Sequence, residues 1–195
     1  MLGFTRNRRK RVESPVLPVV ERPAPKFCLE RSARFFEFWY GLPRNGLLPD
    51  RSAFDPVHIR DLMPDLAMIE LHNESHHSFR LAGTRLVESL GADPTGKAFE
   101  SIIDESLREG VLPLGNELVS RPCGGHFVLR IRSAKGYLLR CEVTDLPMTN
   151  DKTGVPIVLS YLPVIEILDV HDEREPGICD VETVEWIDLG GGVPW

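Results

Sequence analysis

The sequence has no run of about 18 or more uninterrupted apolar residues, so it predicts no transmembrane helix. It also lacks the apolar region of a signal peptide, because Val12–Val20, which follows a basic start, is broken by Glu13, Pro15 and Pro18. We therefore expect a cytoplasmic protein. Its 195 residues are enough for one globular domain with extensions.

Signatures of catalysis and of metal binding are also missing. There is no Gly-x-Ser-x-Gly elbow, Walker loop, Rossmann fingerprint or His-Glu-x-x-His pair. The acidic pair Asp104-Glu105 precedes a predicted helix, where carboxylates stabilise the amino end. His72, His76 and His77 fall in a polar loop, which is typical of solvated histidines rather than of convergent metal ligands. We expect no catalytic residue and no metal site.

The four cysteines form no C-x-x-C pair, which argues against a zinc ribbon or a thioredoxin-type motif. They are compatible with reduced thiols. Their positions are Cys28, Cys123, Cys141 and Cys179.

Charge is distributed unevenly, although the net charge is only −6. Residues 1–26 begin with a basic cluster and continue with four prolines, which predicts a disordered arm. The arm could touch an anionic lipid surface, RNA or an acidic partner, or simply be solvated. Residues 169–195 form an acidic tail, in which we expect either disorder or a short helix beginning at Asp180. Nucleic-acid binding by the whole domain is disfavoured.

Residues 27–64 are predicted to form an N-terminal helical segment. From Cys28 to Tyr40, apolar residues recur at steps of three or four and are aromatic on more than one side. Such a helix needs two partners, which are either the domain and a second copy of the chain or two surfaces of one chain. For a homodimer, the predicted contacts are Leu29, Phe35, Phe36, Phe38, Trp39 and Tyr40.

Residues 65–168 begin with a strand over 65–71, a polar hairpin loop and a second strand from Phe79. Gly83 permits a sharp reversal, Thr84 is a suitable N-cap, and Gly91 suits the left-handed position after a short helix. Further helices are predicted over 99–103 and 106–119, the second of them kinked or interrupted at Pro113. Three strands of clean period two then form a meander to residue 164.

The order of these elements resembles a PAS domain, and the local sequence sharpens the resemblance. The segments that carry it are Phe38-Trp39, Leu48-Pro49-Asp50-Arg51, Phe54-Asp55-Pro56, Leu62-Met63-Pro64, Phe79 to Thr84 and Gly91 to Gly96. Together they resemble a proteobacterial PAS family that is often found as stand-alone proteins of about this size. The resemblance implies an α+β fold, with a five-stranded antiparallel sheet, helices over one face and a preceding N-terminal helix.

The resemblance also implies a sensory or regulatory protein without an output domain, acting through a small ligand or a partner protein. A ligand would lie between the sheet and its helices; plain core packing would give the same apolar pattern. The implied lining is Leu81, Phe99, Leu107, Val111, Leu114, Leu129, Ile131, Cys141, Val143, Leu159 and Tyr161. The alternatives are a constitutive adaptor with a filled core and a small enzyme.

The resemblance names no cofactor. Photoreceptor members bond flavin through a helical cysteine, whereas Cys123 stands among proline and glycine. Haem-binding members carry a histidine on the long helix, and residues 106–120 contain none, although His126 follows. Strand parity places Arg130, Arg132 and Arg140 on the outer face with Glu142 as their cross-strand partner, where the aromatic helix or a partner protein would dock.

Overall fold

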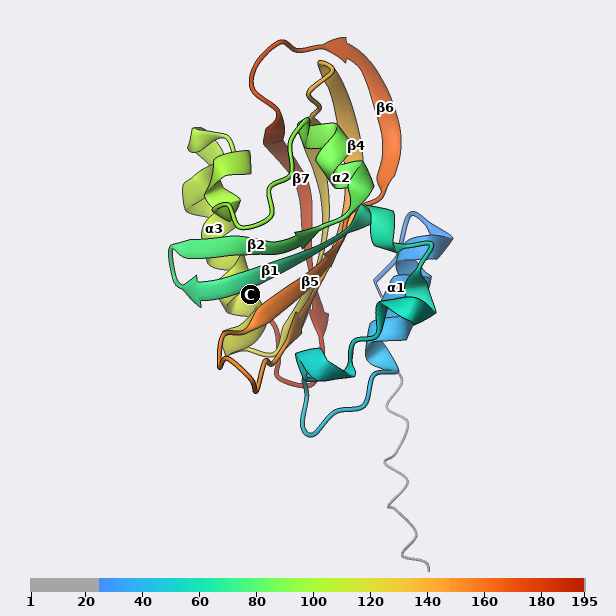
Figure 1. Cartoon of the computed structure of the whole chain (residues 1–195), viewed down its shortest axis with the longest axis vertical. Helices are drawn as coiled ribbons and strands as arrows, with labels where there is room; N and C mark the ends of the chain where they lie inside the picture. The colour runs from blue at the N-terminus through green and yellow to red at the C-terminus, as the bar shows by residue number, and fades with distance from the viewer. Residues whose placement is uncertain (1–24, 195) are drawn as a thin grey trace, which may run out of the picture.

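The computed structural model describes residues 25–194 as a seven-stranded antiparallel sheet with helices on both faces (Figure 1). The predicted disordered arm, except for its last two residues, lies outside this range. The helices are α1 (Glu30–Tyr40), α2 (Thr84–Leu90) and α3 (Glu105–Ser120), with the 3₁₀ turns η1 (Arg51–Ala53), η2 (Pro56–Ile59), η3 (Met63–Asp65) and η4 (Phe99–Ile102). The strands are β1 (Leu66–Asn73), β2 (His76–Ala82), β3 (Cys123–Arg132), β4 (Tyr137–Met148), β5 (Ile157–Tyr161), β6 (Val164–His171) and β7 (Gly177–Asp188).

The sheet contains the five predicted strands in the spatial order β2-β1-β5-β4-β3, which confirms the expected fold class. β5 pairs with one half of β4 and β6 with the other half, so the third strand of the meander continues beyond the predicted end. A two-residue break at Leu162 and Pro163 separates β5 from β6, and Pro163 lacks the N–H that a ladder requires.

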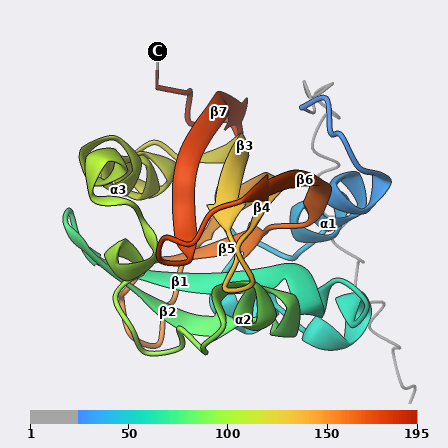
Figure 2. The same ribbon diagram turned by 90° about the horizontal axis from the view of Figure 1, so that it is seen from above.

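The acidic tail adds a strand that the sequence did not predict. β7 pairs with β3 along its whole length and lies at the edge of the sheet (Figure 2). The short helix expected from Asp180 is therefore wrong. Val181, Val184 and Ile187 suggested a helical spacing, but pairing with the open edge of β3 outweighs so weak a local preference.

Helix α1 packs against the outer face of the sheet, on the side opposite α3 (Figures 1 and 2). Phe35 and Trp39 are fully buried there, and the Phe35 ring stacks on Tyr161 of β5 at a centroid distance of 5.0 Å. Aromatic side chains buried to this extent contribute about 2 kcal/mol or more each. The predicted docking of the aromatic helix on the outer face is thus present within one chain.

Glu142 of β4 holds the amino end of α1, which has no side-chain cap of its own. Its fully buried carboxylate accepts hydrogen bonds from the backbone N–H groups of Cys28 at 2.6 Å and Leu29 at 3.1 Å, and from the Ser32 hydroxyl at 2.6 Å. His126 Nε2 lies 2.8 Å from the same carboxylate. The strand therefore supplies the acceptor that helix N-termini require.

The corner between β2 and α2 depends on glycines, as predicted, although Thr84 is the first helical residue and Gly83 is the N-cap. A Cβ at Gly83 would lie 2.3 Å from the Met63 carbonyl oxygen, so η3 leaves no room for a side chain. Gly91 ends α2 in the left-handed conformation with φ of 74°. The sequence predicted that the helix would be kinked or interrupted at Pro113. α3 runs through Pro113 without interruption.

Candidate functional site

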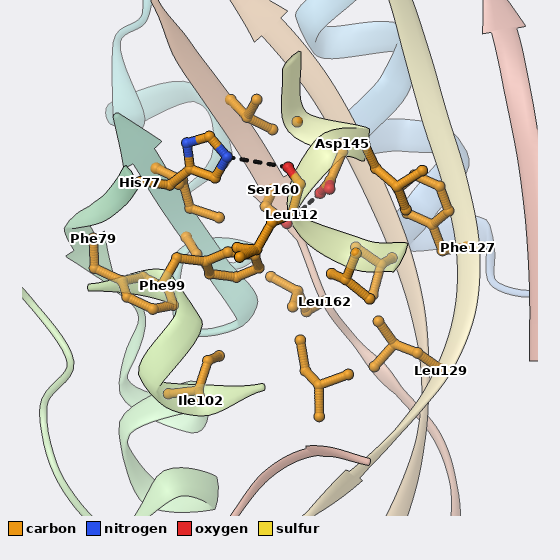
Figure 3. A pocket seen from close by; sticks show the side chains of 18 of the residues that line it. His77, Phe79, Phe99, Ile102, Leu112, Phe127, Leu129, Asp145, Ser160 and Leu162 are labelled. Carbon is orange, nitrogen blue, oxygen red and sulfur yellow. Dashed lines mark hydrogen bonds between the residues drawn. The ribbon is translucent and has the colours of Figure 1, made fainter. Parts of the chain in front are cut away.

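An apolar cavity of about 70 Å³ lies between the inner face of the sheet and the cover formed by α3, η4 and α2 (Figure 3). Every core strand contributes to its wall, and α3 contributes five residues. The lining comprises Ala67, Ile69, Leu71, His77, Phe79, Leu86, Phe99, Ile102, Val111, Leu112, Leu114, Gly115, Leu118, Phe127, Leu129, Ile131, Val143, Asp145, Val158, Ser160, Leu162, Ile178 and Val181. The position is the one expected for a ligand.

Six of the residues predicted from sequence line this cavity. They are Phe99, Val111, Leu114, Leu129, Ile131 and Val143. Leu107 and Cys141 belong to the same inner apolar cluster but do not reach the cavity surface. Whether any of these residues binds a ligand stays a prediction.

Leu81, Leu159 and Tyr161 need correction, because they pack on the opposite face of the sheet under α1. In β2 a register shift skips one residue between Phe79 and Leu81, so a strict alternation assigned Leu81 to the wrong face. In β5 the predicted alternation is correct, but Leu159 and Tyr161 were assigned to the inner face and lie on the outer face. Both faces are covered, so residue size alone does not tell the inner set from the outer set.

The polar residues of the cavity were missed by the sequence analysis. Ser160 of β5 lies opposite Asp145 of β4, and its hydroxyl donates a hydrogen bond to Asp145 Oδ1 (Figure 3). Ala67 of β1 is the neighbour of Ser160 on the other side, so the pair lies beside a small residue that leaves space above the sheet. The sequence did contain a signal for this pair, because Asp145 of β4 and Ser160 of β5 occupy inward-facing positions in strands where the other inward-facing residues are mostly apolar.

Asp145 is a carboxyl group in apolar surroundings. Burial raises its pKa to about 6, and the hydrogen bond from Ser160 only partly opposes that shift. Within residues 25–194, no lysine, arginine or histidine forms an ion pair with it. The cavity therefore contains a carboxyl group whose charge the described part of the chain does not balance.

His77 connects the cavity wall of β2 to α3. Its side chain is buried, and Nε2 lies 3.1 Å from the carbonyl oxygen of Leu112. Because a carbonyl only accepts, Nε2 carries the proton. Nδ1 is buried without a partner among the described residues.

The three histidines of the polar loop do not converge. His72 and His76 stack on each other at an exposed site, whereas His77 points beneath α3. Over the described range, no group of three or more His, Cys, Asp or Glu side chains is placed to hold a metal ion. Burial raises the pKa of the Cys123 thiol to about 11 and that of Cys141 to about 12, so neither is a ready thiolate.

The arginines of the outer face have partners other than the one expected. Arg130 and Arg140 lie opposite each other, and each Nε donates to one oxygen of Glu182 on β7 at 2.7 Å. Arg132 pairs with Asp104. The assignment of Glu142 as their cross-strand partner is wrong, because that carboxylate is occupied by α1 and His126.

An antiparallel sheet with an apolar cavity beneath a helical cover defines an α+β domain. A family model described as PAS domain matches residues 29–162, which is more than half of the chain, and the protein belongs to the PAS domain family. No curated protein and no solved structure matches the chain significantly. PAS domains are generally sensory rather than catalytic. In the part of the chain that is described, no helix is both long and apolar enough to cross a membrane.

Proposed function

We propose that this protein is a PAS-type sensory or regulatory protein in signal transduction, and that a small ligand in the inner cavity is its signal. The observation that carries the proposal is the cavity itself, which is apolar on most of its surface and polar at Asp145 and Ser160. Small-molecule sites commonly combine an apolar wall with a few placed polar groups. The proposal assigns no catalytic residue and no cofactor.

The mechanism would be a population shift. A ligand that fills the cavity contacts both the sheet and α3, so it favours the packing of α3 that fits it best. His77 belongs to the cavity wall and also bonds to Leu112 of α3, so a displaced His77 would move with that helix. The surface that α3 offers to a partner protein would change as a result.

Cavity filling tests this proposal. Val111→Phe adds a ring to a residue that lines the cavity, and Leu107→Phe makes a similar change one turn earlier, outside the lining. Native mass spectrometry of the purified wild-type protein and thermal shifts with a metabolite library would identify a ligand. We expect its thermal shift to disappear in Val111→Phe and to persist in Leu107→Phe. A shift that survives in both variants would rule out this cavity as the site.

The alternative function is a constitutive adaptor with no ligand. The small volume of the cavity, about 70 Å³, favours this alternative, because many cores contain voids of modest size. It predicts that no molecule co-purifies, that no library compound shifts the melting temperature, and that Val111→Phe leaves binding to a partner protein unchanged.

We also propose a homodimer through α1, formed by a smaller surface than the sequence suggested. Phe35, Phe36 and Trp39 are buried within the chain and leave Leu29, Phe38 and Tyr40 partly exposed. Sedimentation equilibrium of wild type and Phe38→Ser tests the proposal. We expect a dimer that Phe38→Ser weakens, and a wild-type monomer at high concentration would overturn it.

A further inference from the structure

The polar pair in the cavity restricts what the ligand can be, provided that the proposed ligand function holds. Asp145 lines the cavity, accepts one hydrogen bond from Ser160 and forms no ion pair within residues 25–194. Carboxylates in apolar surroundings are ordinarily paired with a cation or held neutral, because an unpaired buried charge is costly. Asp145 has no cationic partner among the described residues, so a ligand with a hydrogen-bond donor would complete the site, and a cationic donor would satisfy the ionised carboxylate best.

The other polar groups of the cavity favour the same conclusion. His77 Nε2–H is already used by Leu112, and His77 Nδ1 can only accept while the ring is neutral. The Ser160 hydroxyl donates to Asp145, which leaves its oxygen to accept. The wall thus offers acceptors and no cation, so a ligand carboxylate or phosphate would meet no favourable charge.

Volume and lining define the rest of the ligand. A cavity of about 70 Å³ is roughly half the size of the engineered apolar cavity that holds benzene, which limits an occupant to about three or four non-hydrogen atoms. Around the pair, the surface consists of aliphatic side chains and of the Phe79, Phe99 and Phe127 rings (Figure 3). A short hydrocarbon body fits such a surface.

We infer that the cavity binds a small aliphatic primary amine, whose ammonium group donates to Asp145 and Ser160 while its hydrocarbon part fills the space under α3. Binding neutralises the carboxylate and removes apolar surface from water at the same time. The amine thereby removes the one unbalanced charge of the cavity, and amine concentration becomes the signal.

Four molecules of one shape test the inference. They are propylamine, propan-1-ol, propanoic acid and butane, which share a three-carbon body and differ at its end. Calorimetry and NMR titration of the full chain at pH 8 should rank the amine first, by about tenfold or more over the alcohol. Equal or tighter binding of the alcohol, the acid or the hydrocarbon would overturn the inference and leave a ligand-binding cavity in place.

Two variants separate charge from shape. Asp145→Asn keeps the size of the side chain and should weaken the amine about tenfold or more while changing the alcohol by less than about threefold. Ser160→Ala should weaken both by a smaller factor, and it serves as a second variant if Asp145→Asn folds poorly. Unchanged amine affinity in Asp145→Asn would overturn the inference.

The pH dependence of amine binding gives an independent test. Asp145 and His77 are the ionisable side chains among the residues that line the cavity. Protonation of Asp145, whose pKa is about 6, removes the charge with which an ammonium ligand would pair. We expect weaker amine binding at pH 5 than at pH 8 in wild type and a much smaller difference in Asp145→Asn. If none of the four molecules binds and Val111→Phe changes no thermal shift, the proposed ligand function fails together with the inference.

Discussion

Gly83 shows how one residue positions the cover of the sheet. Its φ of −69° is open to any residue, so the requirement for glycine comes from space rather than from backbone conformation. Its N–H donates to Leu66 of β1 at 2.7 Å, while a Cβ would lie 2.3 Å from the oxygen of Met63 and 2.4 Å from that of Pro64. Backbone atoms on both sides leave no flexible group to move.

We predict that Gly83→Ala destabilises the protein by about 2 kcal/mol or more, because the added methyl must displace the η3 backbone. Urea unfolding measures the change. Gly110→Ala is the matched control, since that glycine lies on the exposed side of α3 with nothing within 4 Å of its Cβ position, and it should stabilise by about 0.5–1 kcal/mol. Equal effects of the two changes would contradict this account of the corner.

Asp145 predicts a pH dependence of stability with a defined sign. Its pKa is about 6 in the folded protein and 3.8 in the reference state, so the folded protein binds the proton more tightly. Its contribution is fully present below about pH 4 and is lost as the pH rises through 6. A pKa difference of about two units corresponds to roughly 2–3 kcal/mol of unfolding free energy.

The difference in unfolding free energy between wild type and Asp145→Asn isolates this contribution, because other carboxyl groups cancel. We predict that wild type loses about 2 kcal/mol or more relative to the variant between pH 4 and pH 7.5. In Ser160→Ala the midpoint should move upward, because the Ser160 hydrogen bond lowers the pKa of Asp145. A difference that does not change with pH would show that Asp145 is well solvated.

At this scale the sequence predicted apolar residues of the cavity better than polar ones. Val111, Leu129 and Val143 were found because their periodicity points to an inner face. Asp145 was missed because one polar residue at an inward-facing position is a weak signal, which does not tell the wall of a cavity from the rim of a sheet. His77 was assigned to a solvated loop, although β2 already begins at His76.

At the scale of elements, α1 depends on a contact far away in the sequence. Glu142 accepts hydrogen bonds from the backbone N–H groups of Cys28 and Leu29, just before the helix, and from the Ser32 hydroxyl in its first turn. His126 Nε2 lies 2.8 Å from the same carboxylate. Burial acts to raise the pKa of Glu142, but these donors outweigh it and lower that pKa. Likewise, burial acts to lower the pKa of His126, and the hydrogen bonds to Glu142 and Glu185 outweigh it and raise that pKa.

We predict that Glu142→Gln costs about 3 kcal/mol and loosens α1 before the rest of the domain, because an amide presents donors to groups that already donate. Hydrogen exchange should accelerate over Glu30–Tyr40 more than in the strands. Glu37→Gln, on the exposed side of the same helix, is the control and should change neither quantity measurably. Uniform acceleration across the sheet would mean that Glu142 supports the core rather than the helix.

The element order was predictable and the edges of the sheet were not. Hydrophobic period and turn residues located α1, α2, α3 and the five core strands, because those signals are local. β7 depends on an open edge and on Glu182 bridging Arg130 and Arg140, which are opposite each other only in the folded sheet. No window of the tail sequence contains that information.

On the scale of the whole molecule, α1 and α3 cover opposite faces of the sheet and differ in how deeply their apolar side chains are buried. Beneath α1 the aromatic residues are buried, whereas Leu107, Val111 and Leu114 of α3 are only half-buried. α3 also covers the cavity, to which it contributes Val111, Leu112 and Leu114 among others. Regions with fewer buried apolar contacts open at lower free energy, so a ligand would enter by displacement of α3 rather than of α1.

His77 is one of the polar links that limit this opening, because its bond to Leu112 connects β2 with the middle of α3. The Asn116 amide of α3 also donates to the Glu74 carbonyl oxygen at 3.0 Å. We predict that His77→Phe, which keeps a ring and removes the donor, accelerates hydrogen exchange in α3 about fivefold and leaves α1 unchanged. His76→Phe is the control, since that exposed neighbour stacks on His72 and lies near Glu100, both of which are outside α3. In His77→Phe, faster hydrogen exchange in α3 and faster ligand association, with unchanged protection of the inner strands, would identify α3 as the entrance to the cavity. Equal exchange in both variants would place the entrance elsewhere and separate the cavity from the helix that is proposed to report its occupancy.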